Sequence, residues 1–289
     1  MRRVPTAAAT VALVASIVVG IPAAANAAAP PGRYVALGDS YTSGPFIPNQ
    51  VDLNCVRSDH NYPSLVAATI HSSEFKDVSC GGATTGDILA PGSGELGIQV
   101  PAQLAAVTAS SALVTVQIGG NDIGFSDIIT TCAEESLSNP FGSPCTKHFT
   151  AGGTDQLQAR IADTAPKVTT VLQAVHAAAP GARVLVLGYP ALLPDTGSGC
   201  WPTVPIAFGD TPYLRSTEKS LNSMLSGVAA ANGALFVDTY TPSIGHDACK
   251  SSSVRWVEGL IPSNPSAPMH PNAAGERGMA TEVVAALNA

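Results

Sequence analysis

The sequence has few charged and few aromatic residues. Only 12% of its 289 residues are Asp, Glu, Lys or Arg, and only 5% are Phe, Trp or Tyr. Acidic residues outnumber basic ones by 21 to 14, which gives a formal net charge of −7. An acidic surface repels phosphate backbones and anionic headgroups, so nucleic acid is a poor partner and a neutral substrate fits better.

The sequence also lacks a Cys-x-x-Cys pair and a long apolar run. Without such a pair, and with its six histidines scattered, the chain offers no metal-ligand cluster, so we expect no metal and no cofactor. The apolar run at 11–21 is shorter than the ~20 residues that span a bilayer, so we expect no integral membrane span.

The N-terminal segment has the pattern of a secretory signal peptide. Arg2 and Arg3 precede the apolar run, and an A-x-A tripeptide occupies 25–27. We expect cleavage after Ala27, with the next two alanines as close alternatives, and a secreted protein. The remaining residues, 28–289, have the length of one large domain and carry a net charge of −9, because the removed segment holds two arginines and no acid.

All six cysteines follow that segment. An even number of cysteines in an exported protein predicts disulfides, and six allow fifteen pairings. We expect the sequential pairing, in which each bond closes one loop: Cys55 with Cys80, Cys132 with Cys145, and Cys200 with Cys249.

Short strand-type runs alternate with helical patterns along the chain. Strands are expected at 34–37, 75–78, 113–118, 183–187 and 235–237. Helices are expected at 62–71, 155–179, 211–232 and 272–287, with Pro166 bending or splitting the second and Asn272 capping the last. Several strands are nearly continuous apolar runs, which is typical of a parallel sheet buried on both faces. The pattern predicts a three-layer α/β/α sandwich around a parallel sheet of about five strands.

Two stretches, 125–153 and 190–212, show no periodicity and are expected to be loops. Each contains cysteine, proline and glycine. Long loops within a domain are usually functional or cross-linked, and these follow the carboxyl ends of strands. We expect them to form walls of the functional site, with apolar residues of 189–193, 201–208 and 260–262 beside the cleft.

Ser40 lies in the sequence GDSY at 38–41, directly after the first expected strand. Gly38 allows a sharp turn, and Asp39 can hydrogen-bond the turn and fix it. A serine at the carboxyl end of a parallel strand is well placed to act as a nucleophile, although GDS is also common in ordinary turns.

Three later positions could complete a site around this serine. Gly82 follows the second strand, and Asn121 lies in GGND at 119–122, after the third strand; both could supply oxyanion donors. His270 precedes the last helix and could act as the base, with His246 as a rival. Each motif alone also fits a plain turn or a surface histidine, but their order along the chain would gather them at one sheet edge.

Together these motifs resemble those of the SGNH hydrolase superfamily, the GDSL-type lipases and esterases, from residue 34 to the C-terminus. GDSY is similar to the first block, with Tyr41 in place of Leu, and Gly82, GGND and His270 match the other blocks. The resemblance implies a flavodoxin-like fold, Ser40 as nucleophile and His270 as base. It also implies an oxyanion hole of the Ser40 and Gly82 amides and the Asn121 side chain, and three sequential disulfides, as in secreted bacterial members.

One position departs from the family pattern. The family usually has an Asp three residues before the histidine, where this sequence has Ala267. A third group must still orient the imidazole. We expect a main-chain carbonyl, of Ala267 or Pro268, to accept from His270 Nδ1–H. A remote carboxylate, Asp238 or Asp247, is the alternative.

The sequence therefore predicts a secreted carboxylic ester hydrolase with a Ser–His dyad and an acyl-enzyme intermediate. The scarcity of aromatic residues favours neutral lipid-like or short acyl esters over carbohydrate esters. The alternatives are a carbohydrate deacetylase or thioesterase of the same fold and, from another class, a non-catalytic binding module. We expect a monomer.

Overall fold

The computed structural model describes Met1 and residues 32–289. The expected signal peptide at 1–27 therefore lies, Met1 apart, outside the described residues. Pro31–Ala289 forms one structural unit. None of the helices in residues 32–289 has both the length and the hydropathy that crossing a membrane requires.

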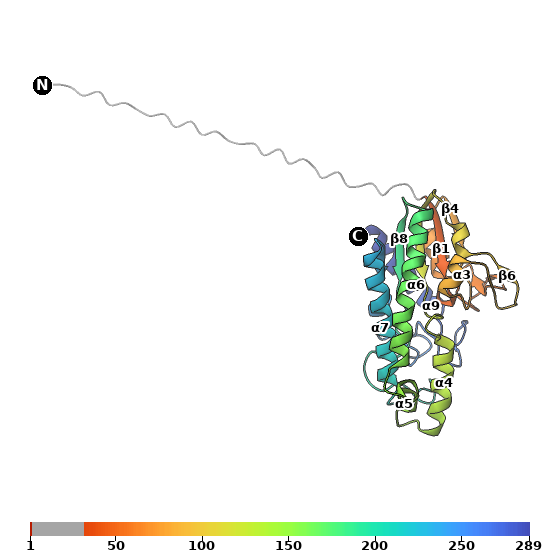
Figure 1. The fold of residues 1–289 in the computed structure, drawn as a ribbon, viewed down its shortest axis with the longest axis vertical. Coiled ribbons are helices and arrows are strands. Elements are labelled where there is room, and N and C mark those ends of the chain that lie inside the picture. The colour runs from red at the N-terminus through yellow and green to blue at the C-terminus, as the bar shows by residue number, and fades with distance from the viewer. Residues whose placement is uncertain (2–31) are drawn as a thin grey trace. The chain divides into compact units, whose positions relative to one another are not determined.

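A five-stranded sheet with its strands in the order β4-β1-β7-β8-β9 lies at the centre of the fold (Figure 1). Every neighbouring pair is parallel. The strands are β1 (Arg33–Gly38), β4 (Glu74–Asp77), β7 (Ser111–Gln117), β8 (Arg183–Leu187) and β9 (Leu235–Val237). All five lie within a few residues of the expected positions, and the three central strands, β1, β7 and β8, are mostly buried.

Helices cover both faces of the sheet, which confirms the three-layer fold. In β1, Tyr34 and Ala36 belong to one buried cluster, and Val35 and Leu37 belong to the other. The first cluster is completed by α2 (Tyr62–Thr69) and α9 (Ala273–Asn288), and the second by α6 (Gln156–Ala178) and α7 (Thr211–Ala231). Successive residues of β1 thus face opposite cores, which explains its unbroken apolar sequence.

Of two local signals that the sequence offered for these helices, one acts as expected and the other does not. Asn272 caps α9 as expected, and its side chain accepts from the backbone amides of Ala274 and Gly275. Pro166 does not split α6, which continues as one helix through it. Buried side chains on both sides of the proline, including Ile161 and Val168, hold the helix on the sheet. That packing outweighs the ~3 kcal/mol cost of an interior proline.

The expected loop at 125–153 is wrong: it contains α4 (Phe125–Ser138) and α5 (Pro144–Thr150). The buried residues of α4 are Ile128, Cys132 and Ser136, spaced by one helical turn. Ser136 is polar but satisfied, since its hydroxyl donates to the Cys132 carbonyl and accepts from the Ala207 amide. A serine on the buried face hides the helical period from a hydrophobicity pattern. The segment 190–210, in contrast, holds no helix or strand, as expected.

Short elements connect these layers. They are α1 (Ser40–Ser43), β2 (Gln50–Asp52), β3 (Arg57–Ser58), α3 (Thr85–Leu89), β5 (Gly92–Ser93), β6 (Gln99–Val100), the 3-10 helix η1 (Gln103–Ala106) and α8 (Tyr240–Ser243). β2 pairs antiparallel with β3, and β5 pairs antiparallel with β6.

The six cysteines form the sequential disulfides, as expected: Cys55–Cys80, Cys132–Cys145 and Cys200–Cys249. Their sequence separations are 25, 13 and 49 residues. Closing loops of this size stabilises the folded chain by about 3–4 kcal/mol each in the chain-entropy model.

Candidate active site

Ser40 is the first residue of α1, directly beyond the carboxyl end of β1. The turn depends on Gly38, because a Cβ there would lie 2.1 Å from Thr42 Oγ1 and 2.8 Å from the Gln117 carbonyl oxygen. It also depends on Asp39, whose Oδ1 accepts from the Tyr41 amide at 2.9 Å. These contacts fix the backbone on both sides of the Ser40 side chain.

His270 lies against this serine although 230 residues separate the two in the chain. Its Nε2 is 2.7 Å from Ser40 Oγ, and its Nδ1 is 2.7 Å from the Pro268 carbonyl oxygen. Because a carbonyl can only accept, Nδ1 carries the proton and Nε2 is left to accept from the hydroxyl. Desolvation lowers the pKa of His270 below its usual value, and the bond to Pro268 acts in the opposite direction. The imidazole is therefore neutral and oriented toward Ser40.

Of the two carbonyls that the sequence left open, Pro268 contacts the ring. The Ala267 carbonyl instead accepts from the Ser266 hydroxyl at 3.2 Å and from the His270 amide at 3.3 Å. Met269, between Pro268 and His270, has a positive φ of 59°. This left-handed residue turns the chain back, so that the Pro268 carbonyl and the imidazole meet two residues apart.

A buried carboxylate supports the segment that carries His270. Glu258 is 0% exposed and accepts from Asn264 Nδ2 at 2.7 Å, from Asn272 Nδ2 at 2.7 Å and from the Ser263 amide at 2.8 Å. Burial opposes its ionisation, but these hydrogen bonds outweigh burial and keep the pKa of Glu258 below its usual value. The carboxylate thus holds both ends of the loop between 258 and 272.

Tyr41, which stands where the family motif has leucine, also holds this segment. Its hydroxyl donates to the Met269 carbonyl at 2.7 Å, and its ring centroid lies 5.0 Å from that of His270. The substitution therefore adds a direct hydrogen bond between the serine turn and the histidine loop.

Gly82 and Asn121 lie in one open cleft with Ser40 and His270. Gly82 has a φ of 72°, a conformation that glycine adopts without strain. Asn121 Nδ2 donates to the Ala83 carbonyl at 2.8 Å, which leaves the second hydrogen of this amide for another acceptor. Within residues 32–289, neither the Ser40 nor the Gly82 backbone N–H donates to a protein acceptor. The residues that carry these three N–H groups therefore line the same cleft as His270.

The sequence placed Tyr189 among the residues beside the cleft but did not predict that it connects two parts of this site. Its hydroxyl donates to Asp39 Oδ2 at 2.6 Å and accepts from the Gly120 amide at 2.9 Å. Burial raises the pKa of Asp39 to about 7, although the hydrogen bonds from Tyr189 and Tyr41 oppose the shift. The hydroxyl thus bridges the serine turn and the loop that carries Asn121. The available signal was its position, directly after β8 at the carboxyl end of the sheet.

The other candidate groups lie elsewhere. His246 stacks on Trp256, with ring centroids 4.7 Å apart, and its Nδ1 is 2.6 Å from the Val254 carbonyl oxygen. Asp238 accepts from the Tyr240 amide, and Asp247 accepts from the Cys249 amide. The structure therefore places neither acid against the imidazole, where the Pro268 carbonyl occupies the orienting position.

A second, apolar pocket opens beside Ser40. It has an empty volume of about 670 Å³, counted to its open mouth. Tyr189, Leu192 and Leu193 line it as expected, but the segment 201–208 contributes no lining residue. The remaining wall comes largely from around α4, the helix that the sequence did not reveal, and from α7, including Ile123, Ile128, Ile129, Leu214 and Leu221. Such a pocket suits an acyl chain.

Among residues 32–289, no group of three or more His, Cys, Asp or Glu residues is arranged to hold a metal ion.

Comparison with known proteins agrees with this geometry. The model of the GDSL-like lipase/acylhydrolase family matches residues 36–277. The chain belongs to this family. A Streptomyces coelicolor protein named Lipase 2 is 39% identical to this GDSL-like hydrolase over 300 residues, covering 99% of this chain and 97% of its own.

Two solved structures share the fold of this GDSL-like hydrolase. A phospholipase A1 from Streptomyces albidoflavus is 31% identical with a TM-score of 0.73, over 89% of this chain and 99% of its own. An extracellular lipase from Streptomyces rimosus is 30% identical with a TM-score of 0.68, over 88% and 99%. Family and relatives together make this chain a serine ester hydrolase.

Proposed function

We propose that this chain is an exported lipase or esterase in which Ser40 and His270 act as a catalytic dyad. The observation that carries the proposal is the continuous hydrogen-bonded series from the Pro268 carbonyl through the imidazole to Ser40 Oγ, with 2.7 Å at each step. The carbonyl takes the orienting role that an acid takes in a Ser-His-Asp triad.

In the proposed reaction, Ser40 Oγ attacks the ester carbonyl carbon while His270 Nε2 takes the hydroxyl proton. The Ser40 and Gly82 amides and Asn121 Nδ2 donate to the oxyanion. When the intermediate collapses, the C–O bond breaks and the imidazolium gives its proton to the leaving alcohol, which leaves an acyl-enzyme. Water then attacks the acyl carbon with His270 again as base, and the acid and free Ser40 are formed.

The apolar pocket supports a substrate with an acyl chain. It opens at Ser40, between α4 and α7, and its lining is largely apolar, from aliphatic and aromatic side chains. The relatives named lipase and phospholipase A1 point the same way. We therefore favour neutral lipid-like or short acyl esters over acetylated carbohydrates or thioesters, and a panel of acyl lengths tested against acetylated glycans and thioesters separates these classes.

The setting proposed for this reaction is outside the cell. The basic and apolar N-terminal segment with its A-x-A tripeptide supports export, as do the three disulfides. Cleavage after Ala27, a monomer, and no nucleic-acid partner remain part of the proposal. N-terminal sequencing of the secreted protein tests the cleavage site.

The test of the dyad compares Ser40→Ala with Ser126→Ala, a matched change at an exposed serine of the same cleft. Ser40→Ala should abolish hydrolysis of p-nitrophenyl esters and labelling by a fluorophosphonate probe, because it removes the nucleophile. Ser126→Ala should keep both. Full activity in a folded Ser40→Ala protein would refute the assignment.

A further inference from the structure

Five large apolar side chains are exposed on the three segments that contribute Phe46, Leu53 and Leu96 to the catalytic cleft. They are Phe46, Val51, Leu53, Leu96 and Ile98, each 58–67% exposed; we call them the apolar platform. They come from the segment after α1, the β2–β3 hairpin and the β5–β6 hairpin, whose β6 strand stands at the right-hand edge of Figure 1. Singly exposed apolar residues are ordinary, but a group at the rim of a site indicates an interaction surface.

The two hairpins are tied into one rigid support by Asn54. Its side chain donates to the Ile98 carbonyl at 3.0 Å and accepts from the Leu96 amide at 3.1 Å, and its carbonyl accepts from the Glu95 amide at 2.7 Å. The neighbouring Cys55–Cys80 disulfide fixes the same segment to the loop after β4. These contacts therefore fix the backbone of both hairpins before anything binds.

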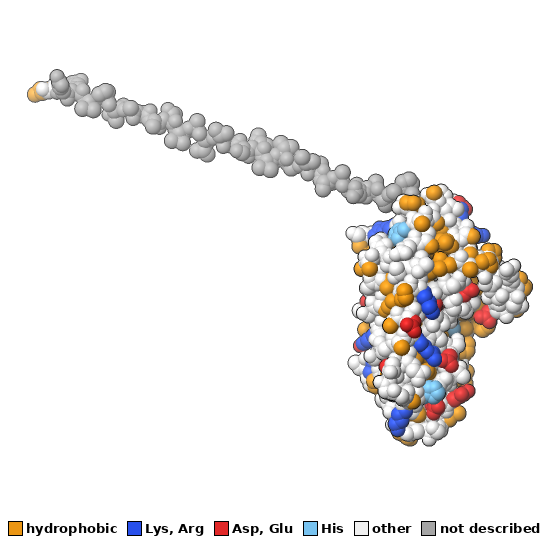
Figure 2. Space-filling view, in the orientation of Figure 1, with side chains coloured by type: hydrophobic (Ala, Val, Ile, Leu, Met, Phe, Trp, Pro, Cys, Tyr) orange, Lys and Arg blue, Asp and Glu red, His pale blue; other side chains and the backbone are white. Residues whose placement is uncertain are grey.

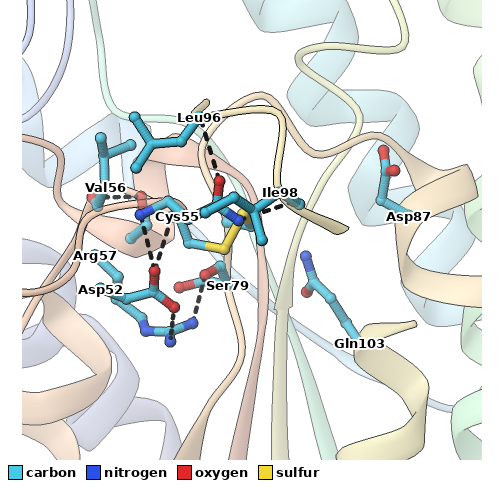
Figure 3. Close-up of a disulfide and its surroundings, with 12 residues drawn as sticks. Asp52, Cys55, Val56, Arg57, Ser79, Asp87, Leu96, Ile98 and Gln103 are labelled. Carbon is cyan, nitrogen blue, oxygen red and sulfur yellow. Dashed lines mark hydrogen bonds and ion pairs between the residues drawn. A yellow bond between two sulfur atoms is a disulfide. The ribbon is translucent and has the colours of Figure 1, made fainter. Parts of the chain in front are cut away.

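Figure 3 shows where the ion pair of the β2–β3 hairpin lies relative to this surface. Leu96 and Ile98 lie on one side of the disulfide, and the ion pair of Asp52 and Arg57 lies on the other. The pair has an N–O distance of 2.8 Å, and Arg57 also donates to the Ser79 carbonyl. The positive charge of the hairpin is thus neutralised within the support.

The backbone conformation of Phe46 is independent evidence that the exposure of its side chain is a feature of the fold. Its φ is 64°, in the left-handed region that glycine adopts freely and a bulky residue rarely adopts. A phenyl ring is nevertheless held there and is 58% exposed. Backbone outliers of this kind gather where a surface binds something.

The position of the platform limits what can cover it. Phe46, Leu53 and Leu96 line the same cleft as Ser40 and His270, so any occupant of the platform also sits over the reacting groups. A second copy of the chain docked here would close the cleft mouth. An ester-bearing lipid surface, in contrast, would present substrate to the serine.

The charge of the chain selects the kind of lipid. Glu95 is exposed at the cleft, residues 28–289 carry a net charge of −9, and the face in Figure 2 shows acidic and basic side chains scattered among each other. Anionic headgroups would be repelled, and the platform offers no basic cluster to attract them. An interface without net charge is the matching partner.

We propose that the apolar platform docks the enzyme on the surface of aggregated lipid with no net charge, so that the cleft opens toward the interface. The proposal rests on the proposed ester hydrolysis and adds to it a binding surface distinct from the acyl pocket. Adsorption to the surface, rather than capture of single molecules from solution, would then set the rate on aggregated substrate.

The test uses Val51→Ser/Ile98→Ser, because neither residue lines the cleft or the acyl pocket. The control is Leu235→Ser, which changes a 42%-exposed leucine at the amino end of β9, the end of the sheet opposite the site. Binding is measured by co-flotation with phosphatidylcholine vesicles, each change being made in the Ser40→Ala protein to prevent hydrolysis. We expect the double variant to bind at least tenfold more weakly, and the control to bind as Ser40→Ala does.

Activity separates this proposal from the proposed function. With Ser40 present, the double variant should hydrolyse soluble p-nitrophenyl butyrate within twofold of the unsubstituted enzyme but lose at least fivefold on vesicles or emulsions. Failure of the ester-hydrolase proposal would show as no turnover of the soluble ester by the unsubstituted enzyme. Equal vesicle binding by both proteins would overturn the platform alone.

A gain-of-signal variant covers the case in which the serine substitutions disturb folding. Val51→Trp should show a blue shift of its emission when phosphatidylcholine vesicles are added, and Leu235→Trp should not. Binding only to phosphatidylglycerol vesicles, lost at high salt, would overturn docking on a neutral surface. A dimer that dissociates in the double variant, without vesicle binding by the parent, would assign the platform to a second copy instead.

Discussion

Replacing Tyr189 by phenylalanine should destabilise the protein by an amount that depends on pH. The change deletes one hydroxyl that donates to Asp39 and accepts from the Gly120 amide, both of which are buried. A buried amide left without an acceptor costs about 1–3 kcal/mol. The bond to Asp39 contributes about 1 kcal/mol when the carboxyl is protonated and about 1.5–3 kcal/mol when it is ionised.

The pKa of Asp39, raised to about 7 by burial, determines which of these two free energies applies at a given pH. At pH 5 the folded protein holds this carboxyl protonated, so the loss should be about 2–4 kcal/mol. At pH 9 the carboxylate loses its donor, and the loss should be about 2.5–6 kcal/mol, which is about 1 kcal/mol more than at pH 5 for the same cost of the amide. The difference corresponds to a rise of about one unit in the pKa of Asp39, since one unit is 1.36 kcal/mol.

Urea unfolding at pH 5 and pH 9 measures both values, with Tyr240→Phe as the matched control. The Tyr240 hydroxyl also lies against a carboxylate, Asp195 Oδ1, at 3.1 Å, but that carboxylate lies at the surface. The control should lose less than about 1 kcal/mol at either pH.

We also expect Tyr189→Phe to lower kcat about tenfold, because the bridge between Ser40 and the Asn121 loop is cut. Equal losses at the two pH values, or equal losses in both variants, would refute the reasoning.

Three further predictions concern the histidine and a buried acid. The acid limb of kcat/KM on a soluble ester should have an apparent pKa below 6.5, because desolvation keeps His270 neutral to lower pH; a limb at or above 6.5 would contradict this. Pro268→Ala should keep kcat within about threefold, because only the main-chain oxygen orients the ring, whereas a hundredfold loss in a folded protein would exclude that role. Glu276 is fully buried, and burial raises its pKa well above the usual range, so its stabilising contribution is present at low pH and is lost as pH rises. Glu276→Gln should therefore lose less stability than the unsubstituted protein between pH 6 and pH 9 in thermal melts, and parallel curves would count against it.

The fold was predictable because its core segments carry their own signals. The runs that became β1, β7 and β8 are nearly continuous apolar runs, which is typical of a parallel sheet covered on both faces. Ser40 and His270 could be singled out because each follows a strand or precedes a capped helix. The residues that form the site lie at these junctions, and the junctions can be recognised from the sequence.

The parts that were missed depend on contacts between distant segments. Helix α4 buries Ser136, so its apolar residues alone do not show a helical period. The buried hydroxyl is satisfied by the Ala207 amide, which comes from a distant segment. Tyr189 matters through Asp39, 150 residues earlier in the chain. The choice of Pro268 over Ala267 is a choice between two identical backbone groups, which side-chain patterns cannot distinguish. The two hairpins of the platform owe their shape to Asn54 and a disulfide rather than to any repeat.

The 230 residues between Ser40 and His270 have a consequence for the order in which the enzyme becomes competent. Ser40 emerges with the first strand, but His270 arrives three residues before α9, whose Glu276 accepts from the Tyr62 amide of α2. A nascent or clipped chain that ends before His270 holds a complete serine turn without the imidazole that the structure places against it. In the proposed mechanism, reactivity therefore depends on a segment that is synthesised long after the serine turn.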